Sequence, residues 1–137
     1  MKFLLDTNVV SEFRTSKASP SVVAWASSIP AEWLCISVIT ILEVETGVLR
    51  MERRDPVQGG AMRRWFENSV LRSFEGGTLI IDTIIARQCA KLHVPNPKGE
   101  RDAFIAATAL VHGLTLVTRN TEDFTTTGVK LLNPWEQ

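Results

Sequence analysis

The chain has 137 residues, a length that fits one domain, here residues 1–137, and is too short for two of ordinary size. Apolar residues make up 45% and charged residues 22%, which is typical of a globular protein and excludes a disordered chain. Lysine plus arginine equals aspartate plus glutamate at 15 each, so the chain lacks the basic excess usual in nucleic-acid-binding proteins. No apolar run is long enough for a membrane-spanning helix or a signal peptide, and we expect a cytoplasmic protein.

The first part of the chain predicts two short strands and three helices. Asp6 ends the first apolar segment, and Ser19, followed by a proline at the first helical position, is typical of a helix N-cap. Ser37 is a similar cap after the second apolar segment. The expected elements are, in order, a strand at 3–5, helices at 9–14 and 20–29, a strand at 33–36 and a helix at 38–53.

The rest of the chain continues the alternation of helix and strand. The pairs 55–56 (Asp-Pro) and 59–60 (Gly-Gly) predict a loop, after which apolar residues recur at helical spacing. Asp82 is a candidate N-cap, and Gly113 is a candidate C-terminal cap. The expected elements are a helix at 62–74, a strand at 78–81, helices at 83–92 and 100–112, and strands at 114–117 and 129–132.

Five short apolar strands separated by helices predict an α/β fold. The pattern favours a parallel or mostly parallel five-stranded sheet with helices on both faces, which is a three-layer α/β/α sandwich. In such folds ligands bind outside the carboxyl ends of the strands, where the strand order reverses. Candidate functional residues should therefore lie just after the strands.

Four acidic residues occupy such positions or the helices beside them. Asp6 follows the first strand, Asp102 lies in the first turn of a helix, and Asp123 follows a late strand. Each has an ordinary structural explanation as well: a helix cap, a favourable charge at the helix dipole, and a turn former, respectively. Taken singly, these three leave both interpretations open.

Glu43 is harder to explain by structure alone. No lysine or arginine stands three or four residues away on its helix, so its carboxylate needs a partner from elsewhere. Glu45 lies about 200° around the same helix, so the two cannot face one site. If the strands at 3–5 and 114–117 are neighbours, several carboxylates converge, and only hard cations such as Mg²⁺ or Mn²⁺ make that arrangement tolerable. Such a centre activates water to attack a phosphodiester.

The acidic residues lie within segments that resemble the VapC-type PIN-domain toxins, and among these the FitB-like subgroup. The resemblance spans the whole chain, with the motifs in order. The matching segments are 5–12 (LDTNVVSE), 37–43 (SVITILE) with Gly47, 101–109 (RDAFIAATA), 116–120 (LVTRN) with Asp123-Phe124, and 133–135 (NPW).

The resemblance implies a PIN-like sandwich that acts as a Mg²⁺- or Mn²⁺-dependent endoribonuclease. Such a protein is the toxin of a type II toxin–antitoxin pair, cleaves cellular RNA (tRNA is one candidate) and is neutralised by a cognate antitoxin. It also implies a homodimer and, with the antitoxin, a larger assembly. The implied catalytic residues are Asp6, Glu43, Asp102 and Asp123, of which the first three bind the metal, with Thr118 and Asn120 orienting the site.

Two residues of this chain are candidates for the position of the fourth acidic residue. Some family members carry it at the position of Asn120 and others at that of Asp123. This chain has an amide at the first position and a carboxylate at the second, so we expect Asp123 to act as a weak or water-mediated ligand. A second metal ion is correspondingly uncertain.

A local basic excess is a weaker candidate for contact with RNA. Between residues 50 and 72 there are six arginines against three acids. A solvated helix face explains this pattern as well as an RNA contact does. The candidates are Arg53, Arg54, Arg63 and Arg64.

Three other functions are compatible with parts of this pattern. A phosphoacceptor signalling domain needs a second acid beside Asp6 and a lysine after a late strand, and neither is present. A haloacid-dehalogenase-type phosphatase needs an aspartate at position 8, which is Asn8. The stronger alternative is a PIN fold kept as a non-catalytic binding module, although clustered carboxylates would be a costly feature of a purely structural fold.

Overall fold

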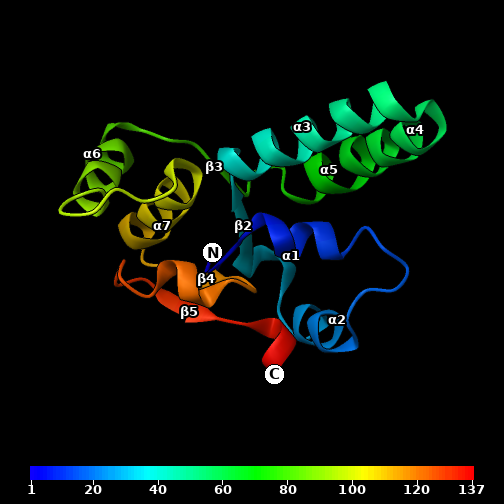
Figure 1. The fold of residues 1–137 in the computed structure, drawn as a ribbon. Coiled ribbons are helices and arrows are strands. Elements are labelled where there is room, and N and C mark those ends of the chain that lie inside the picture. Colours follow the sequence, from blue (N-terminus) through cyan, green and yellow to red (C-terminus); the bar gives the residue numbers. More distant parts are fainter.

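The computed structural model describes residues 1–137 and has a five-stranded sheet at its centre (Figure 1). All neighbouring strands are parallel, in the order β3-β2-β1-β4-β5. The chain builds β1, β2 and β3 outward on one side and then crosses to β4 and β5 on the other, so the switch point lies between β1 and β4. The strands are β1 (Phe3–Leu5), β2 (Leu34–Ser37), β3 (Thr78–Leu79), β4 (Thr115–Val117) and β5 (Lys130–Leu132).

Helices connect the strands, and most of their ends follow the cap signals in the sequence. The Ser37 hydroxyl accepts from Ile39 N, and the Asp82 carboxylate accepts from Ile85 N, as expected of N-caps. Ser19 stands at the predicted N-cap, but its side chain makes no capping bond. The α-helices are α1 (Thr7–Glu12), α2 (Pro20–Ser27), α3 (Val38–Arg54), α4 (Pro56–Trp65), α5 (Leu71–Ser73), α6 (Thr83–Leu92) and α7 (Glu100–His112). Short 3-10 turns cover Ala31–Trp33, Thr121–Phe124 and Pro134–Glu136.

The sheet is covered on both faces, which confirms the three-layer sandwich. Because side chains alternate along a strand, Leu5 and Val117 point to one core and Leu4 and Leu116 to the other. The first core is closed by α1, α2, α3 and the segment after α4, and the second by α7. A smaller apolar cluster joins α7 to α6, which lies farther out (Figure 1). No helix of the protein has the length and apolar character needed to cross a membrane.

The region after α3 differs from the sequence expectation. The glycine pair at 59–60 lies inside α4 instead of a loop, because Asp55 caps a helix that already begins at Pro56. At Gly59 the backbone of α4 lies directly against that of α3: a Cβ there would stand 2.4 Å from the Cα of Glu52. The glycine therefore serves helix packing. A π-helical segment, Phe66–Val70, then continues the helix into α5.

Candidate active site

Asp6 stands at the carboxyl end of β1, beside the switch point, and both its oxygens are held. It is 6% exposed. The backbone N–H of Thr7 donates to Oδ1 at 2.8 Å, and the Thr118 hydroxyl donates to Oδ2 at 2.8 Å. Thr118 comes directly after β4, so the pairing of β1 with β4 brings these residues together. Asp6 is thus a helix cap, as one interpretation of the sequence predicted, and also part of a buried polar cluster.

Thr118 connects Asp6 to the loop that follows β4. Its hydroxyl accepts from Asn8 Nδ2 at 3.3 Å and from the backbone N–H of Asn120 at 3.1 Å. Asn120 therefore reaches the cluster through its backbone, whereas its side chain is exposed. The network ties α1, β4 and the next loop to the Asp6 carboxylate.

A second hydroxyl holds Glu43. The Thr7 hydroxyl donates to Glu43 Oε1 at 2.7 Å and lies 3.0 Å from the hydroxyl of Thr40. Thr40 is buried on α3, one turn before Glu43. The sequence pattern had indicated no role for Thr7, Thr40 or Asn8, although Thr40 stands at the i−3 position that places it on the same helix face as Glu43.

Asp102 completes the group from the first turn of α7. It is half-buried, and its carboxylate lies close to Gly99, the residue just before α7. Burial raises the pKa of Asp102 above its ordinary value, and the negative charges of Asp123 and Glu43 raise it further.

The pKa of Asp6 is also raised, chiefly by burial. The hydrogen bonds from Thr118 and Thr7 oppose the rise, and the charges of Asp102 and Glu43 add to it. Asp6, Glu43 and Asp102 thus lie close enough to repel one another, although no three acidic, histidine or cysteine side chains are spaced to enclose a metal ion in this arrangement. Ionised carboxylates repel one another, so they stay apart when no cation is bound. A divalent cation between them would remove this repulsion.

Asp123 lies at the rim of this cluster. It is exposed on the turn Thr121–Phe124 and acts on Asp102 through its charge. With Asn120 it lines a cavity of about 220 Å³ that has only polar and charged residues around it and does not include Asp6, Glu43 or Asp102. Its position allows contact through water more readily than direct ligation.

The one cation in contact with the cluster comes from α7. Arg101 Nη1 lies 3.8 Å from Glu43 Oε2. Glu43 therefore has a cationic neighbour, from another helix than its own. Sequence spacing could not reveal it, because the contact depends on how α7 packs beside α3.

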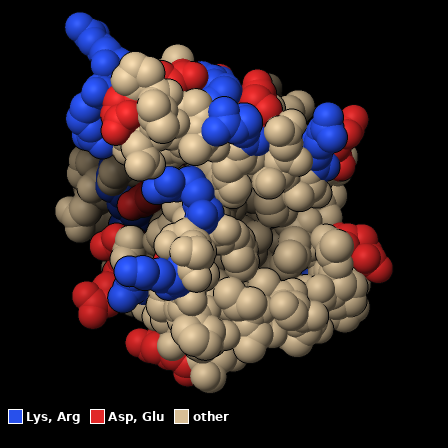
Figure 2. Space-filling model, turned by 90° about the vertical axis from the view of Figure 1, so that its right-hand side faces the viewer, with Lys and Arg blue, Asp and Glu red and all other residues tan.

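The arginines proposed for RNA contact lie away from the acidic cluster. Arg53 is ten residues beyond Glu43 on α3, about 15 Å along the helix axis. Arg53, Arg54 and Arg64 are exposed. In Figure 2, basic and acidic side chains are interspersed over the upper part of the molecule, where α3 and α4 lie, above a broad uncharged surface.

Arg63 has a different role from the one expected. Its guanidinium donates to Glu45 at 2.6 Å and to Glu52 at 2.8 Å, which ties α4 to α3. Arg63 is therefore occupied within the protein, and Glu45 is paired with it. Arg53, Arg54 and Arg64 have no such carboxylate partner.

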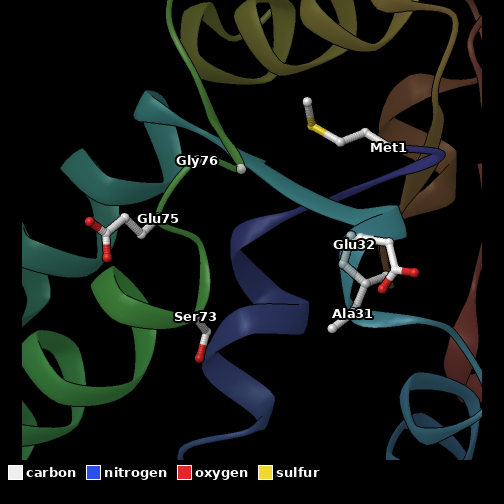
Figure 3. A pocket seen from close by; sticks show the side chains of 8 residues that line it. Met1, Ala31, Glu32, Ser73, Glu75 and Gly76 are labelled. Carbon is white, nitrogen blue, oxygen red and sulfur yellow. The ribbon is translucent and has the colours of Figure 1, made fainter.

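The largest cavity lies at the edge of the sheet opposite to the acidic cluster. Its volume is about 390 Å³, and Figure 3 shows Met1, Glu32 and Glu75 around it. These residues precede β1, β2 and β3, so the cavity lies at the amino ends of the strands, away from the carboxylates. It takes no part in the acidic cluster.

The chain and its fold match known proteins over nearly the whole length. The family model described as the PIN domain matches residues 3–130. Toxin FitB of Neisseria gonorrhoeae is 36% identical over 138 residues, covering 96% of this chain and 97% of its own length. VapC ribonuclease Y4jK of Sinorhizobium fredii is 34% identical over 142 residues, covering 97% of each chain.

Solved structures agree. The structure of FitAcB from Neisseria gonorrhoeae superimposes with a TM-score of 0.91 at 33% identity, covering 98% of this chain and 99% of that chain. The structure of FitAB bound to an IR36 DNA fragment superimposes with a TM-score of 0.86 at 34% identity, covering 97% of this chain and 95% of that one.

Proposed function

The chain belongs to the PIN domain family, and from this premise we propose that it is a metal-dependent endoribonuclease, the toxin of a toxin–antitoxin pair. The observation that carries the proposal is the meeting of Asp6, Glu43 and Asp102 at the carboxyl edge of the sheet, where burial and mutual repulsion raise the pKa of both aspartates. A non-catalytic module would have no need of this costly arrangement.

The donor set fits Mg²⁺ or Mn²⁺. All the candidate ligands are carboxylate oxygens, which hard divalent cations prefer. Asp6, Glu43 and Asp102 would hold the ion, with Asp123 as a ligand through water. When bound, the ion supplies an activated water and charge neutralisation at a phosphodiester.

Hydrogen bonds from surrounding residues hold Asp6 and Glu43 in place. The Thr118 hydroxyl and the Thr7 N–H donate to Asp6, and both bonds lower its pKa against the effect of burial. The Thr7 hydroxyl donates to Glu43 and orients its carboxylate. Thr118 and Asn120 orient the site, the latter through its backbone.

The partners follow from the family and the surface. Relatives have been solved as FitAB and VapBC complexes, some with DNA, and we assign this chain a cognate antitoxin. We further propose a homodimer within a larger toxin–antitoxin assembly, and cellular RNA, with tRNA as one candidate, as the substrate. With these partners, we assign its action to the cytoplasm. Arg53, Arg54 and Arg64 are the outer candidates for contact with RNA.

The deciding experiment uses purified protein freed of its antitoxin. Incubated with total RNA, the wild-type chain should release discrete fragments with Mg²⁺ and none with EDTA. Asp6→Asn and Asp102→Asn should abolish the fragments while circular dichroism shows an unchanged fold. Intact RNA under all metal conditions would favour the non-catalytic binding module instead.

A further inference from the structure

Arg101 stands beside the acidic cluster without a strong partner of its own. It immediately precedes Asp102 in the first turn of α7, and its closest carboxylate contact is the 3.8 Å approach to Glu43. That distance is beyond hydrogen-bonding range. The side chain is 55% exposed, so its N–H donors face solvent at the edge of the site.

Structural explanations account poorly for this arginine. The amino end of a helix carries partial positive charge, so a cation in the first turn of α7 is unfavourably placed. A long, exposed ion pair contributes little to stability. By contrast, Arg63, which has a structural role, pairs with the carboxylates of Glu45 and Glu52 at 2.6 and 2.8 Å.

Two other cations stand in the segments next to the site, and neither pairs with its carboxylates. Lys98 Nζ donates to the Thr126 hydroxyl at 2.8 Å, and the Arg119 guanidinium lies over the Trp135 ring at 5.2 Å. Arg101 is thus the cation that contacts the carboxylates, and its N–H donors are free.

We propose that Arg101 binds a backbone phosphate of the RNA beside the acidic cluster and positions the strand for cleavage. This inference rests on the proposed ribonuclease function. A substrate phosphate must approach several carboxylates that repel it, and a guanidinium at their edge offsets that repulsion. Arginine also matches phosphate geometry with two parallel N–H bonds. Arg101 acts here as a positioning residue.

The test measures RNA binding apart from cleavage. A fluorescently labelled single-stranded RNA is titrated in EDTA at several salt concentrations with the wild type, Arg101→Ala, Arg101→Lys and Arg72→Ala. Arg72 is the matched control, because it is equally an exposed helical arginine but precedes β3 at the amino edge of the sheet. Arg101→Ala should raise the Kd about tenfold and flatten the log–log salt slope by about 0.7.

Arg101→Lys keeps the charge, so it should retain the salt slope while recovering only part of the affinity. Arg72→Ala should bind as the wild type does. A further readout is the rise in melting temperature with Mg²⁺, which Arg101→Ala should keep. With Mg²⁺ present, its KM for RNA should rise more than its kcat falls.

Two outcomes would overturn the proposal while leaving the ribonuclease intact. One is cleavage by the wild type together with equal RNA binding by Arg101→Ala and Arg72→Ala. The other is loss of the Mg²⁺ response in Arg101→Ala with unchanged RNA affinity, which would make Arg101 a counter-ion of Glu43 only. A wild-type chain that neither binds nor cleaves RNA would remove the proposed function and this inference together.

Discussion

At the scale of single residues, two hydroxyl groups hold carboxylates of the cluster in place. Thr118 donates to Asp6, and Thr7 donates to Glu43. These bonds compete with burial, which raises the pKa of Asp6 by disfavouring its charged form. The site therefore stores electrostatic free energy that a bound cation can release.

The first prediction concerns that stored free energy. A carboxyl whose pKa is higher in the folded than in the unfolded state costs stability once the pH exceeds the folded value. At neutral pH and without metal, Asp6→Asn should therefore raise the melting temperature by a few degrees, since about 1 kcal/mol shifts a domain of this size by several degrees. Glu32→Gln, at the opposite edge of the sheet, is the control. A melting temperature below that of the control would contradict this account.

At the scale of elements, the close packing of α3 on α4 depends on one glycine. Gly59 meets the backbone of Glu52, whereas a Cβ at Gly60 would meet only the end of the Arg64 side chain, at 3.4 Å. The two glycines are neighbours in one helix, so they share helix propensity but differ in the space around them.

The second prediction uses this pair. Gly59→Ala should lower the free energy of unfolding by about 1–3 kcal/mol through overpacking. Gly60→Ala should be neutral or stabilising by up to about 1 kcal/mol, because alanine is the better helix former. Chemical denaturation of both variants checks the contrast. Equal effects would show that α3 and α4 can separate freely.

The third prediction concerns the arginines of the same two helices. If the exposed Arg53 and Arg54 bind RNA phosphates, replacing both by alanine should weaken binding and flatten its salt slope by about 0.7 for each phosphate that is no longer neutralised. Arg63→Ala should leave the slope unchanged and instead lower the melting temperature, because Arg63 is held by Glu45 and Glu52. RNA titrations over a range of salt concentrations separate the two roles. An unchanged slope in the double variant would show that Arg53 and Arg54 do not touch the RNA.

At the scale of the whole molecule, the site joins elements that are far apart in sequence. β1, α3, α7 and the loop after β4 each contribute one part. A ligand that bridges them links distant segments and stabilises the fold by mass action.

The fourth prediction is metal-linked stability. Millimolar Mg²⁺ or Mn²⁺ should raise the melting temperature of the wild type, and the rise should grow with metal concentration. Asp6→Asn should lose most of this response, whereas Glu32→Gln should keep it. A melting curve indifferent to both ions would count against a metal site at these carboxylates.

The fifth prediction concerns control by the antitoxin. An acidic cluster without its metal is best matched by a guanidinium, so we expect the antitoxin to place an arginine, or else a lysine, among Asp6, Glu43 and Asp102. Expression of this chain alone should halt growth, and co-expression of the antitoxin should restore it. Replacing the basic residue by alanine should weaken inhibition at limiting antitoxin. Undiminished inhibition would leave a purely steric block.

Much of this architecture was predictable from local patterns. Apolar strand segments, the caps at Ser37 and Asp82, and the alternation of strand and helix predicted the three-layer fold that the structure confirms. These features depend on neighbours within a few residues. The Gly-Gly pair at 59–60 wrongly predicted a loop, because the reason for a glycine at position 59 is not local. Gly59 is required by contact with another helix, and the sequence does not show such contacts.

The sequence by itself determined which carboxylates stand at the ends of which elements, because a strand end or a first helical turn is a local property. It left open whether Asp6 was a cap or part of a site. Only the tertiary structure decided that this cap also belongs to a buried hydrogen-bonded cluster beside other carboxylates, since the pairing of β1 with β4 brings Thr118 to Asp6 and the packing of α1 on α3 brings Thr7 to Glu43. It also decided the contacts of two arginines, placing Arg63 between Glu45 and Glu52 and Arg101 beside Glu43. The physical reason is that electrostatic partners are chosen by distance in space, which the packing of helices and strands sets and the spacing of residues does not.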